Sequence, residues 1–257
     1  MGAATSRRRV LVTGASSGIG EAFARHHAAL GDDVILVARN ADQLGRVAGD
    51  LRRAGVVAEI IVADLSHRDG VESVGTRCGE VDVLIANAGV THAASIGTTD
   101  RDTLDEMSYL MSAGVVRLCE ILVPKMIARG GGDVVIVSSI AAFTPMRKAG
   151  PYAAAKAHAT AYAESLALEV VSKGVRVVAV CPGYVRTELH HRAGLAHLNN
   201  KVPGWMWLST DQVVNATMRA LRKGTTVIVP GAIYRLVLPF LSSAVAQGVW
   251  RRLTRRT

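Results

Sequence analysis

The stretch VLVTGASSGIG at residues 10–20 decides the fold of this chain. It opens with a short apolar run, Val10–Val12, and continues into a glycine-rich turn. Apolar residues then recur at helical spacing, at Ile19, Phe23 and Leu30, until Gly31 ends the pattern. A buried strand, a glycine turn and a helix in this order predict the first unit of an α/β domain.

The same alternation of apolar runs and helical segments continues along the chain. The runs are rich in β-branched residues and do not alternate strictly with polar ones, which is typical of strands buried on both faces. They predict a single Rossmann-type, doubly wound domain with a seven-stranded parallel sheet and helices on both faces. The predicted strands are Val10–Val12, Val34–Val37, Ala58–Val62, Val81–Ala86, Val134–Val137, Val175–Val180 and Val227–Val229.

Composition agrees with one α/β domain in a reducing, cytoplasmic setting. Hydrophobic residues make up 49% of the 257 residues but aromatic residues only 4%, so small aliphatic side chains fill the core. The three cysteines have no paired spacing, which predicts neither disulfides nor a metal site, and no apolar signal segment precedes the first strand. The formal net charge is +9, and no acidic residue follows Asp211.

The chain divides into three predicted parts. Residues 1–8 form a disordered basic arm, residues 9–235 form the Rossmann-type domain, and residues 236–257 form an apolar and basic C-terminal tail. Within the domain, residues 183–209 are the least regular stretch, and a loop of this length usually serves as a lid or a binding loop.

The glycine-rich turn has the features of a phosphate-binding loop. Glycines let the backbone turn tightly, and the free N–H groups at the start of the helix favour a diphosphate. Glycines also occur in ordinary strand-to-helix turns, but a position directly after the first strand favours a dinucleotide site. The residues assigned to this site are Gly14, Ser16, Ser17, Gly18, Ile19 and Gly20.

The end of the second predicted strand indicates which dinucleotide binds. An NAD site usually has an acidic residue here to bind the ribose 2′-hydroxyl, whereas this chain has Ala38 followed by Arg39. A guanidinium can pair with a 2′-phosphate, so we expect NADP and consider NAD less favoured. The alternative is that Arg39 is an ordinary solvated residue.

A catalytic constellation follows the fifth predicted strand. Ser139 lies at its end, and Tyr152 and Lys156 lie four residues apart on a helix that begins near Pro151. A neighbouring ammonium is expected to lower the pKa of Tyr152, which would make the phenol a usable acid or base. The pair alone is a weak signal, but its combination with Ser139 and the upstream loop predicts hydride chemistry on a carbonyl or an alcohol.

With these motifs in order, residues 8–230 resemble the short-chain dehydrogenase/reductase family. The resemblance implies that Ser139, Tyr152 and Lys156 are catalytic and that Tyr152 and Lys156 also contact the cofactor. It implies that residues 183–209 cover the substrate, and that the family's usual dimer or tetramer forms. The further cofactor contacts that it implies are Asp64, Leu65, Asn87, Ala88, Gly89, Pro182, Gly183, Val185 and Thr187.

One position departs from the family pattern. The family usually has an Asn in the long helix before the fifth strand, where it holds a water that relays protons to the lysine. In this chain the matching residue is Met111, followed by Ser112 and Gly114. Because a Met side chain cannot hold that water, either Ser112 or a backbone carbonyl takes over the role of the Asn, or the proton relay to the lysine is weaker.

Two other segments leave alternatives open. Trp205 and Trp207 favour a lipophilic or bulky substrate, or they anchor the loop to the body of the domain. The tail is too short and too interrupted to span a bilayer, so it packs against a subunit or contacts an anionic membrane surface. No motif for reading nucleic acid is present.

These observations predict an NADP(H)-dependent oxidoreductase that interconverts a carbonyl group and a secondary alcohol on a lipophilic small molecule. Two alternatives stay open: a cofactor-binding sensor or scaffold with vestigial activity, and a peripheral membrane reductase acting on a lipid-like or steroid-like carbonyl.

Overall fold

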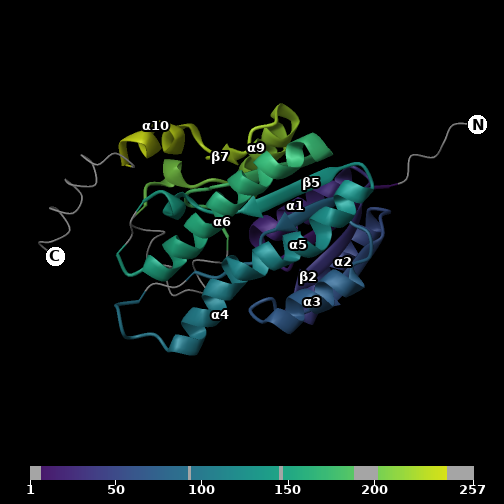
Figure 1. Cartoon of the computed structure of the whole chain (residues 1–257), viewed down its shortest axis with the longest axis horizontal. Coiled ribbons are helices and arrows are strands. Elements are labelled where there is room, and N and C mark those ends of the chain that lie inside the picture. Colours follow the sequence, from purple (N-terminus) through teal and green to yellow (C-terminus); the bar gives the residue numbers. More distant parts are fainter. Residues whose placement is uncertain (1–6, 92–93, 145–146, 188–201, 242–257) are drawn as a thin grey trace, which may run out of the picture.

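A parallel sheet of seven strands forms the centre of the molecule. The computed structural model describes residues 7–91, 94–144, 147–187 and 202–241, and the strand order within them is β3-β2-β1-β4-β5-β6-β7 (Figure 1). The chain therefore winds outward in both directions from β1 and β4, which confirms the predicted doubly wound sheet. The strands are β1 Arg9–Thr13, β2 Asp33–Ala38, β3 Ala58–Val62, β4 Val83–Ala86, β5 Gly132–Val137, β6 Val175–Val180 and β7 Val227–Ile228.

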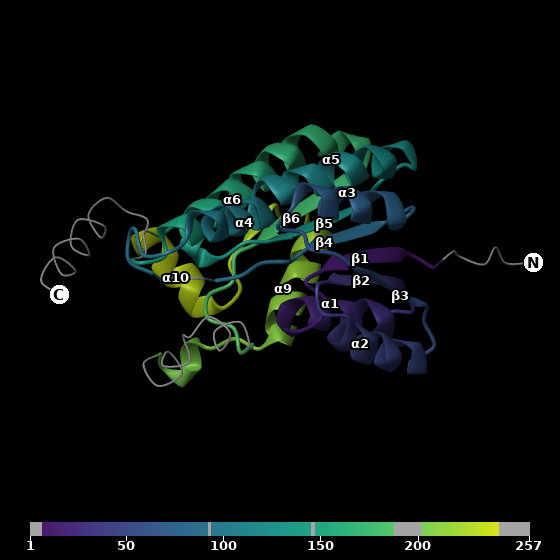
Figure 2. The ribbon, with the colours of Figure 1, turned by 90° about the horizontal axis from the view of Figure 1, so that it is seen from below.

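Helices cover both faces of this sheet. Figure 2 shows α1, α2 and α9 on one side and α3, α4, α5 and α6 on the other. The main helices are α1 Gly18–Ala29, α2 Ala41–Arg53, α3 Arg68–Arg77, α4 Arg101–Met111, α5 Ala113–Ala128, α6 Gly150–Val170, α9 Thr210–Lys223 and α10 Ala232–Leu241.

Successive residues of each strand contribute to opposite layers of the core. Val10 and Val12 pack with α1, α2 and α9, whereas Leu11 between them packs with α3, α5 and α6. Since both layers are apolar, each strand must be apolar at every position, which explains the continuous hydrophobic runs in the sequence. The predicted strand at Val81–Ala86 begins two residues later, at Val83, and the last strand ends at Ile228.

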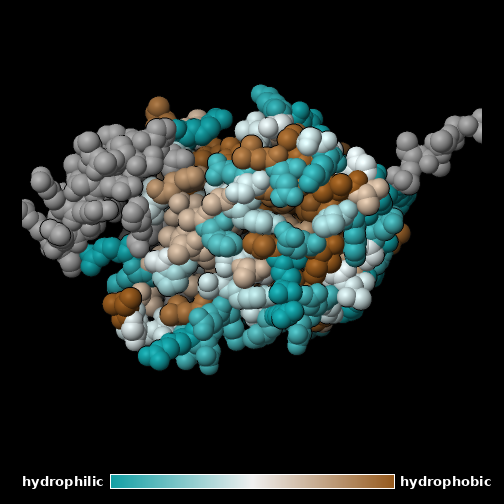
Figure 3. All heavy atoms as spheres, in the orientation of Figure 1, coloured by the Kyte–Doolittle hydropathy of each residue, from teal (hydrophilic) through white to brown (hydrophobic). Residues whose placement is uncertain are grey.

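The helical face that carries α5 and α6 keeps apolar side chains at the surface. Figure 3 shows hydrophobic patches on this side, separated by polar residues. At the end of α6, Leu168 is 83% exposed, and Val171 in the following 3-10 turn is 67% exposed. This face therefore retains apolar area that the single chain does not cover.

Several predicted features lie outside the described residues. They are the first six residues of the arm, the middle of the predicted lid (residues 188–201), and the tail from residue 242. The predicted boundary between residues 235 and 236 falls inside α10, so the tail begins as a continuation of that helix. In the part of the chain that the structure describes, every helix is too short or too polar to cross a membrane.

Candidate active site

The turn between β1 and α1 is packed so closely that two of its glycines cannot be replaced without a clash. Gly14 has a φ of +64°, and a Cβ atom there would lie 2.8 Å from Asn87 Nδ2. A Cβ atom on Gly20 would lie 2.3 Å from the Gly14 carbonyl oxygen. The glycine pattern is thus required both by backbone conformation and by the approach of α1 and β4.

Asn87, directly after β4, locks this turn in place. Its Nδ2 atom donates to the Thr13 carbonyl at 2.9 Å and to the Gly14 carbonyl at 3.2 Å. The Thr13 hydroxyl in turn accepts from the backbone N–H groups of Asn87 at 2.9 Å and Ala88 at 3.0 Å. Sequence reasoning assigned Asn87 and Ala88 but missed the role of Thr13. A hydroxyl at the last residue of a buried strand was the available signal.

The ends of β2 and β3 bring Arg39 and Asp64 together. Arg39 Nη1 lies 3.7 Å from Asp64 Oδ2, and the Arg39 side chain is 65% exposed. Burial raises the pKa of Asp64, but the hydrogen bonds from Ser66 and the charge of Arg39 outweigh it and hold the pKa below the ordinary value. Leu65 beside it is buried. The guanidinium is therefore held near the sheet edge and remains accessible to solvent.

The three predicted catalytic residues converge at the carboxyl end of β5. Ser139 precedes the 3-10 turn η1 (Ile140–Ala142), and its hydroxyl accepts from the Ala141 N–H at 3.2 Å. The Ser139 hydroxyl is also close enough to the Tyr152 hydroxyl to lower the pKa of the phenol. The Lys156 Nζ atom lies 5.9 Å from the centroid of the Tyr152 ring and donates to the Val137 carbonyl at 2.8 Å.

Burial, and not the charge of Lys156, controls the acidity of the Tyr152 phenol. It raises the pKa of Tyr152, and the hydrogen bond with Ser139 offsets that only in part. The predicted lowering of this pKa by Lys156 is therefore wrong for this structure, because the ammonium is directed at the Val137 carbonyl. Burial also lowers the pKa of Lys156 to about 8. At neutral pH the phenol is protonated and can donate.

The titration of Lys156 is expected to appear in the stability of the protein. Its folded pKa of about 8 lies below the ordinary 10.5, so within this window the unfolded chain holds a proton that the folded chain has lost. The free energy of unfolding should consequently rise with pH across the window, by up to about 3 kcal/mol. Urea unfolding of the wild type and of Lys156→Met at about pH 7 and about pH 10 tests this. The free energy of unfolding of the wild type should rise with pH relative to that of Lys156→Met, and a difference that stays constant would contradict the prediction.

The segment after β6 lies against the glycine-rich turn. The Pro182 carbonyl accepts from the Ile140 N–H at 3.0 Å, next to Ser139. A Cβ atom on Gly18 would lie 3.1 Å from Thr187 Cγ2, so Thr187 and the first turn of α1 are in contact. Residues assigned to one cofactor site from four separate stretches of sequence therefore lie along one edge of the sheet.

This arrangement matches a known family. The sequence pattern described as short chain dehydrogenase matches residues 8–196, most of the chain. The chain belongs to the short-chain dehydrogenase family. A dehydrogenase/reductase SDR family protein 7-like protein from Drosophila melanogaster is 35% identical over 188 residues, which cover 70% of this chain and 58% of that protein. The chain thus spans just over half the length of that relative.

Two solved structures share the whole fold. One, a short-chain dehydrogenase from Sphingobium yanoikuyae in complex with NADPH, is 28% identical, with a TM-score of 0.82, and the match covers 97% of this chain and 96% of that one. The other, the bulky-bulky ketone specific alcohol dehydrogenase from Comamonas testosteroni, is 26% identical, with a TM-score of 0.79 and coverage of 98% and 92%. The chain accordingly has the short-chain dehydrogenase fold over nearly its whole length.

Met111, where the family usually has Asn, is buried beside Lys156. Its Sδ atom and Lys156 Nζ lie 3.4 Å and 3.5 Å from the same point, the place where a Cβ atom of Gly89 would be. Met111 ends α4, and the backbone breaks at Ser112 before α5 begins. Ser112 Oγ donates to the Ser108 carbonyl at 2.5 Å, so its hydroxyl supports the break instead of facing Lys156.

The two lid tryptophans have different environments. Trp207 packs against Tyr184, with ring centroids 5.4 Å apart, and its Nε1 donates to the Val202 carbonyl at 3.2 Å. Trp205, in the 3-10 turn η3 (Gly204–Met206), is 66% exposed. Trp207 therefore anchors the lid, and only Trp205 keeps a large free apolar surface.

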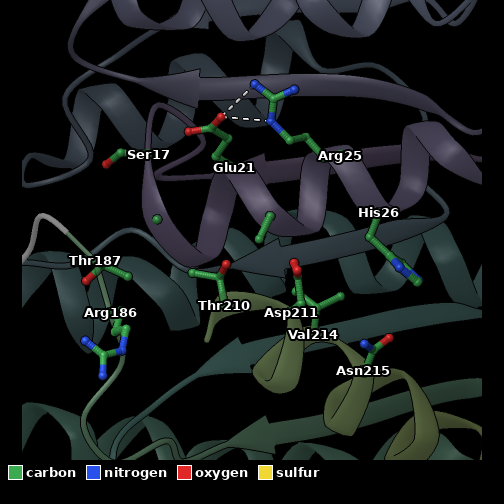
Figure 4. A pocket seen from close by; sticks show the side chains of 12 residues that line it. Ser17, Glu21, Arg25, His26, Arg186, Thr187, Thr210, Asp211, Val214 and Asn215 are labelled. Atoms are coloured by element: carbon green, nitrogen blue, oxygen red, sulfur yellow. Dashed lines mark hydrogen bonds and ion pairs between the residues drawn. The ribbon is translucent and has the colours of Figure 1, made fainter. Parts of the chain in front are cut away.

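A groove of about 640 Å³ opens on the outer side of the glycine-rich turn, between α1 and α9 (Figure 4). Ser17, Arg186 and Thr187 line one end, and Glu21 and Arg25 form an ion pair within it. Among the described residues, no group of three potential ligands is placed to hold a metal ion.

Proposed function

We propose that the chain is an NADP(H)-dependent oxidoreductase that interconverts a carbonyl group and a secondary alcohol. The observation that carries this proposal is the neighbouring Ser139–Tyr152 pair with Lys156 one helical turn further along α6. The pair lies at the sheet edge where the turn after β1 and the segment after β6 meet.

The residues of that edge fit a dinucleotide. The positive φ angles of Gly14 and Gly18 turn the backbone into the start of α1, where N–H groups favour an anion. The Ser17 side chain makes no hydrogen bond to the helix that it precedes, which leaves its hydroxyl for a phosphate oxygen. Asp64 and Leu65 would flank the adenine, and Pro182, Gly183, Val185 and Thr187 the nicotinamide.

The side chains would divide the chemistry as follows. The bound nicotinamide supplies or accepts a hydride at the carbon atom. In the reducing direction Tyr152 gives its phenolic proton to the carbonyl oxygen, and Ser139 donates a hydrogen bond to the same oxygen. Lys156, held by its hydrogen bond to the Val137 carbonyl, would contact the bound cofactor. Burial, which keeps the pKa of Tyr152 high, holds the phenol in its protonated form at neutral pH.

Arg39 supports NADP as the cofactor, and its removal tests the preference. Arg39→Ala should weaken NADPH binding about tenfold to a hundredfold, the value of a charge-assisted contact to phosphate, and leave NADH binding nearly unchanged. Arg53→Ala is the matched control, since Arg53 is 77% exposed and paired with Asp50 in the same way. Titration of both cofactors by fluorescence measures the ratio, and an equal loss for both would contradict a 2′-phosphate contact.

A bulky, lipophilic substrate is supported by the exposed Trp205 and by the similarity to the alcohol dehydrogenase that takes bulky-bulky ketones. A panel of ketones of increasing size, with NADPH consumption as the readout, tests the proposed function directly. Turnover that rises with ketone size supports it; equal turnover of small and bulky ketones contradicts the substrate class.

Met111 favours a second candidate, a cofactor-binding sensor with vestigial activity, because a thioether beside Lys156 cannot relay protons. Tight NADPH binding without turnover of any ketone would support the sensor.

For either function we propose a homodimer or homotetramer, supported by the uncovered apolar surface at Leu168 and Val171.

A further inference from the structure

Tyr234 of α10 connects the C-terminal helix to two distant segments. It is 6% exposed, and its hydroxyl donates to the Met206 carbonyl of η3 at 2.6 Å. The same hydroxyl accepts from the Tyr184 N–H at 3.1 Å. One side chain therefore joins the end of the lid to the segment after β6, over separations of 28 and 50 residues.

The Tyr234 ring also explains the glycine at position 183. A Cβ atom on Gly183 would lie 2.1 Å from Tyr234 Cζ and 2.4 Å from Cε1. The φ angle of Gly183 is not in the left-handed region, so the backbone conformation does not require glycine there. The ring thus occupies the space that a side chain at residue 183 would fill.

The two segments that Tyr234 joins are also paired with each other. Val185 and Leu208 form a parallel bridge, in which Leu208 N–H donates to the Tyr184 carbonyl at 2.9 Å and Arg186 N–H donates to the Leu208 carbonyl at 2.9 Å. We call residues 182–187 together with 202–208 the strap. The strap reaches the glycine-rich turn through the contact of Thr187 with Gly18.

We propose that Tyr234 is a positioning residue that holds the strap against the cofactor site through its hydroxyl. The inference rests on the proposed function, because the strap contains Pro182, Gly183, Val185 and Thr187. Burial raises the pKa of Tyr234, so its hydroxyl keeps the proton that it donates to Met206. The hydroxyl bonds the backbone of Met206 and Tyr184 and not the Ser139, Tyr152 and Lys156 side chains, so its loss should affect cofactor binding more than the chemical step.

Tyr234→Phe tests this by removing the hydroxyl and keeping the ring over Gly183. With two hydrogen bonds lost, we expect the dissociation constant for NADPH and the KM for NADPH to rise about tenfold, with kcat within about twofold. We also expect trypsin to cleave after Arg186 several times faster, which mass spectrometry detects as a fragment beginning at Thr187. The matched control is Tyr162→Phe, whose lost hydroxyl bonds Glu120 at 3.5 Å, between α6 and α5.

The outcomes separate the inference from the proposed function. Faster cleavage and weaker NADPH binding in Tyr234→Phe alone support it, provided that the melting temperature stays close to the wild-type value. Cleavage and binding equal to the wild type, or an equal change in Tyr162→Phe, would overturn it. If the wild type does not bind NADPH, the proposed function fails, and the cleavage rate at Arg186 still decides whether Tyr234 holds the strap.

Discussion

Replacing Tyr152 with phenylalanine is expected to lower kcat by about 10²- to 10⁴-fold, the usual contribution of a positioned proton donor. The change removes the phenolic hydroxyl and its interaction with Ser139, and it keeps the ring that packs against Met111 and Ala155. The binding of NADPH should change little, because the loss concerns the transferred proton. Steady-state rates with the best ketone and cofactor titration give the two measurements.

The control for this result lies on the same helix. Tyr162→Phe removes a hydroxyl from α6 at the Glu120 contact and should leave kcat unchanged. Full activity of Tyr152→Phe would remove the tyrosine from the reaction and direct attention to another donor. Loss of both activity and NADPH binding would indicate instead that the phenol shapes the cofactor site.

Asp133→Asn is expected to cost about 2–3 kcal/mol of folding free energy. Asp133 is the second residue of β5, and its side chain is 2% exposed. Its carboxylate forms ion pairs with Arg176 Nε at 2.7 Å and Arg8 Nη2 at 2.5 Å. Burial raises the pKa of Asp133, but the hydrogen bonds from Arg176 and Arg8 outweigh it and hold the pKa below 3.8. An amide cannot make the same charge-assisted bonds, so Arg8, just before β1, and Arg176 of β6 lose their common partner in β5.

Acid titration distinguishes this ion cluster from a simple packing defect. Because the folded pKa of Asp133 is lowered, its contribution is present above the ordinary pKa and is lost as pH falls through the folded value. Urea unfolding should therefore show the wild type and Asp133→Asn converging in acid. Asp50→Asn is the control: Asp50 also binds two arginines, but at 36% exposure, and we expect a smaller effect. An equal loss in both variants would contradict the role of burial.

Two parts of the site could be predicted from sequence because they depend on local geometry. The spacing of Tyr152 and Lys156 places them on one helical face wherever that helix lies, and Pro151 marks where it begins. Likewise, the apolar runs and Gly14 follow from strands buried on both faces and from a turn with positive φ. The order of these strands and helices along the chain predicts the parallel sheet and the sheet edge that carries the site.

The sequence by itself thus determined the family, the winding of the sheet and the residues that meet at its edge. Only the tertiary structure decided how those residues behave. Burial raises the pKa of Tyr152. Trp205 stays exposed, whereas Trp207 packs against Tyr184. The Tyr234 ring fills the space beside Gly183. Periodicity reports only on neighbours within a few residues, whereas desolvation and contacts across 50 residues arise when distant segments pack together.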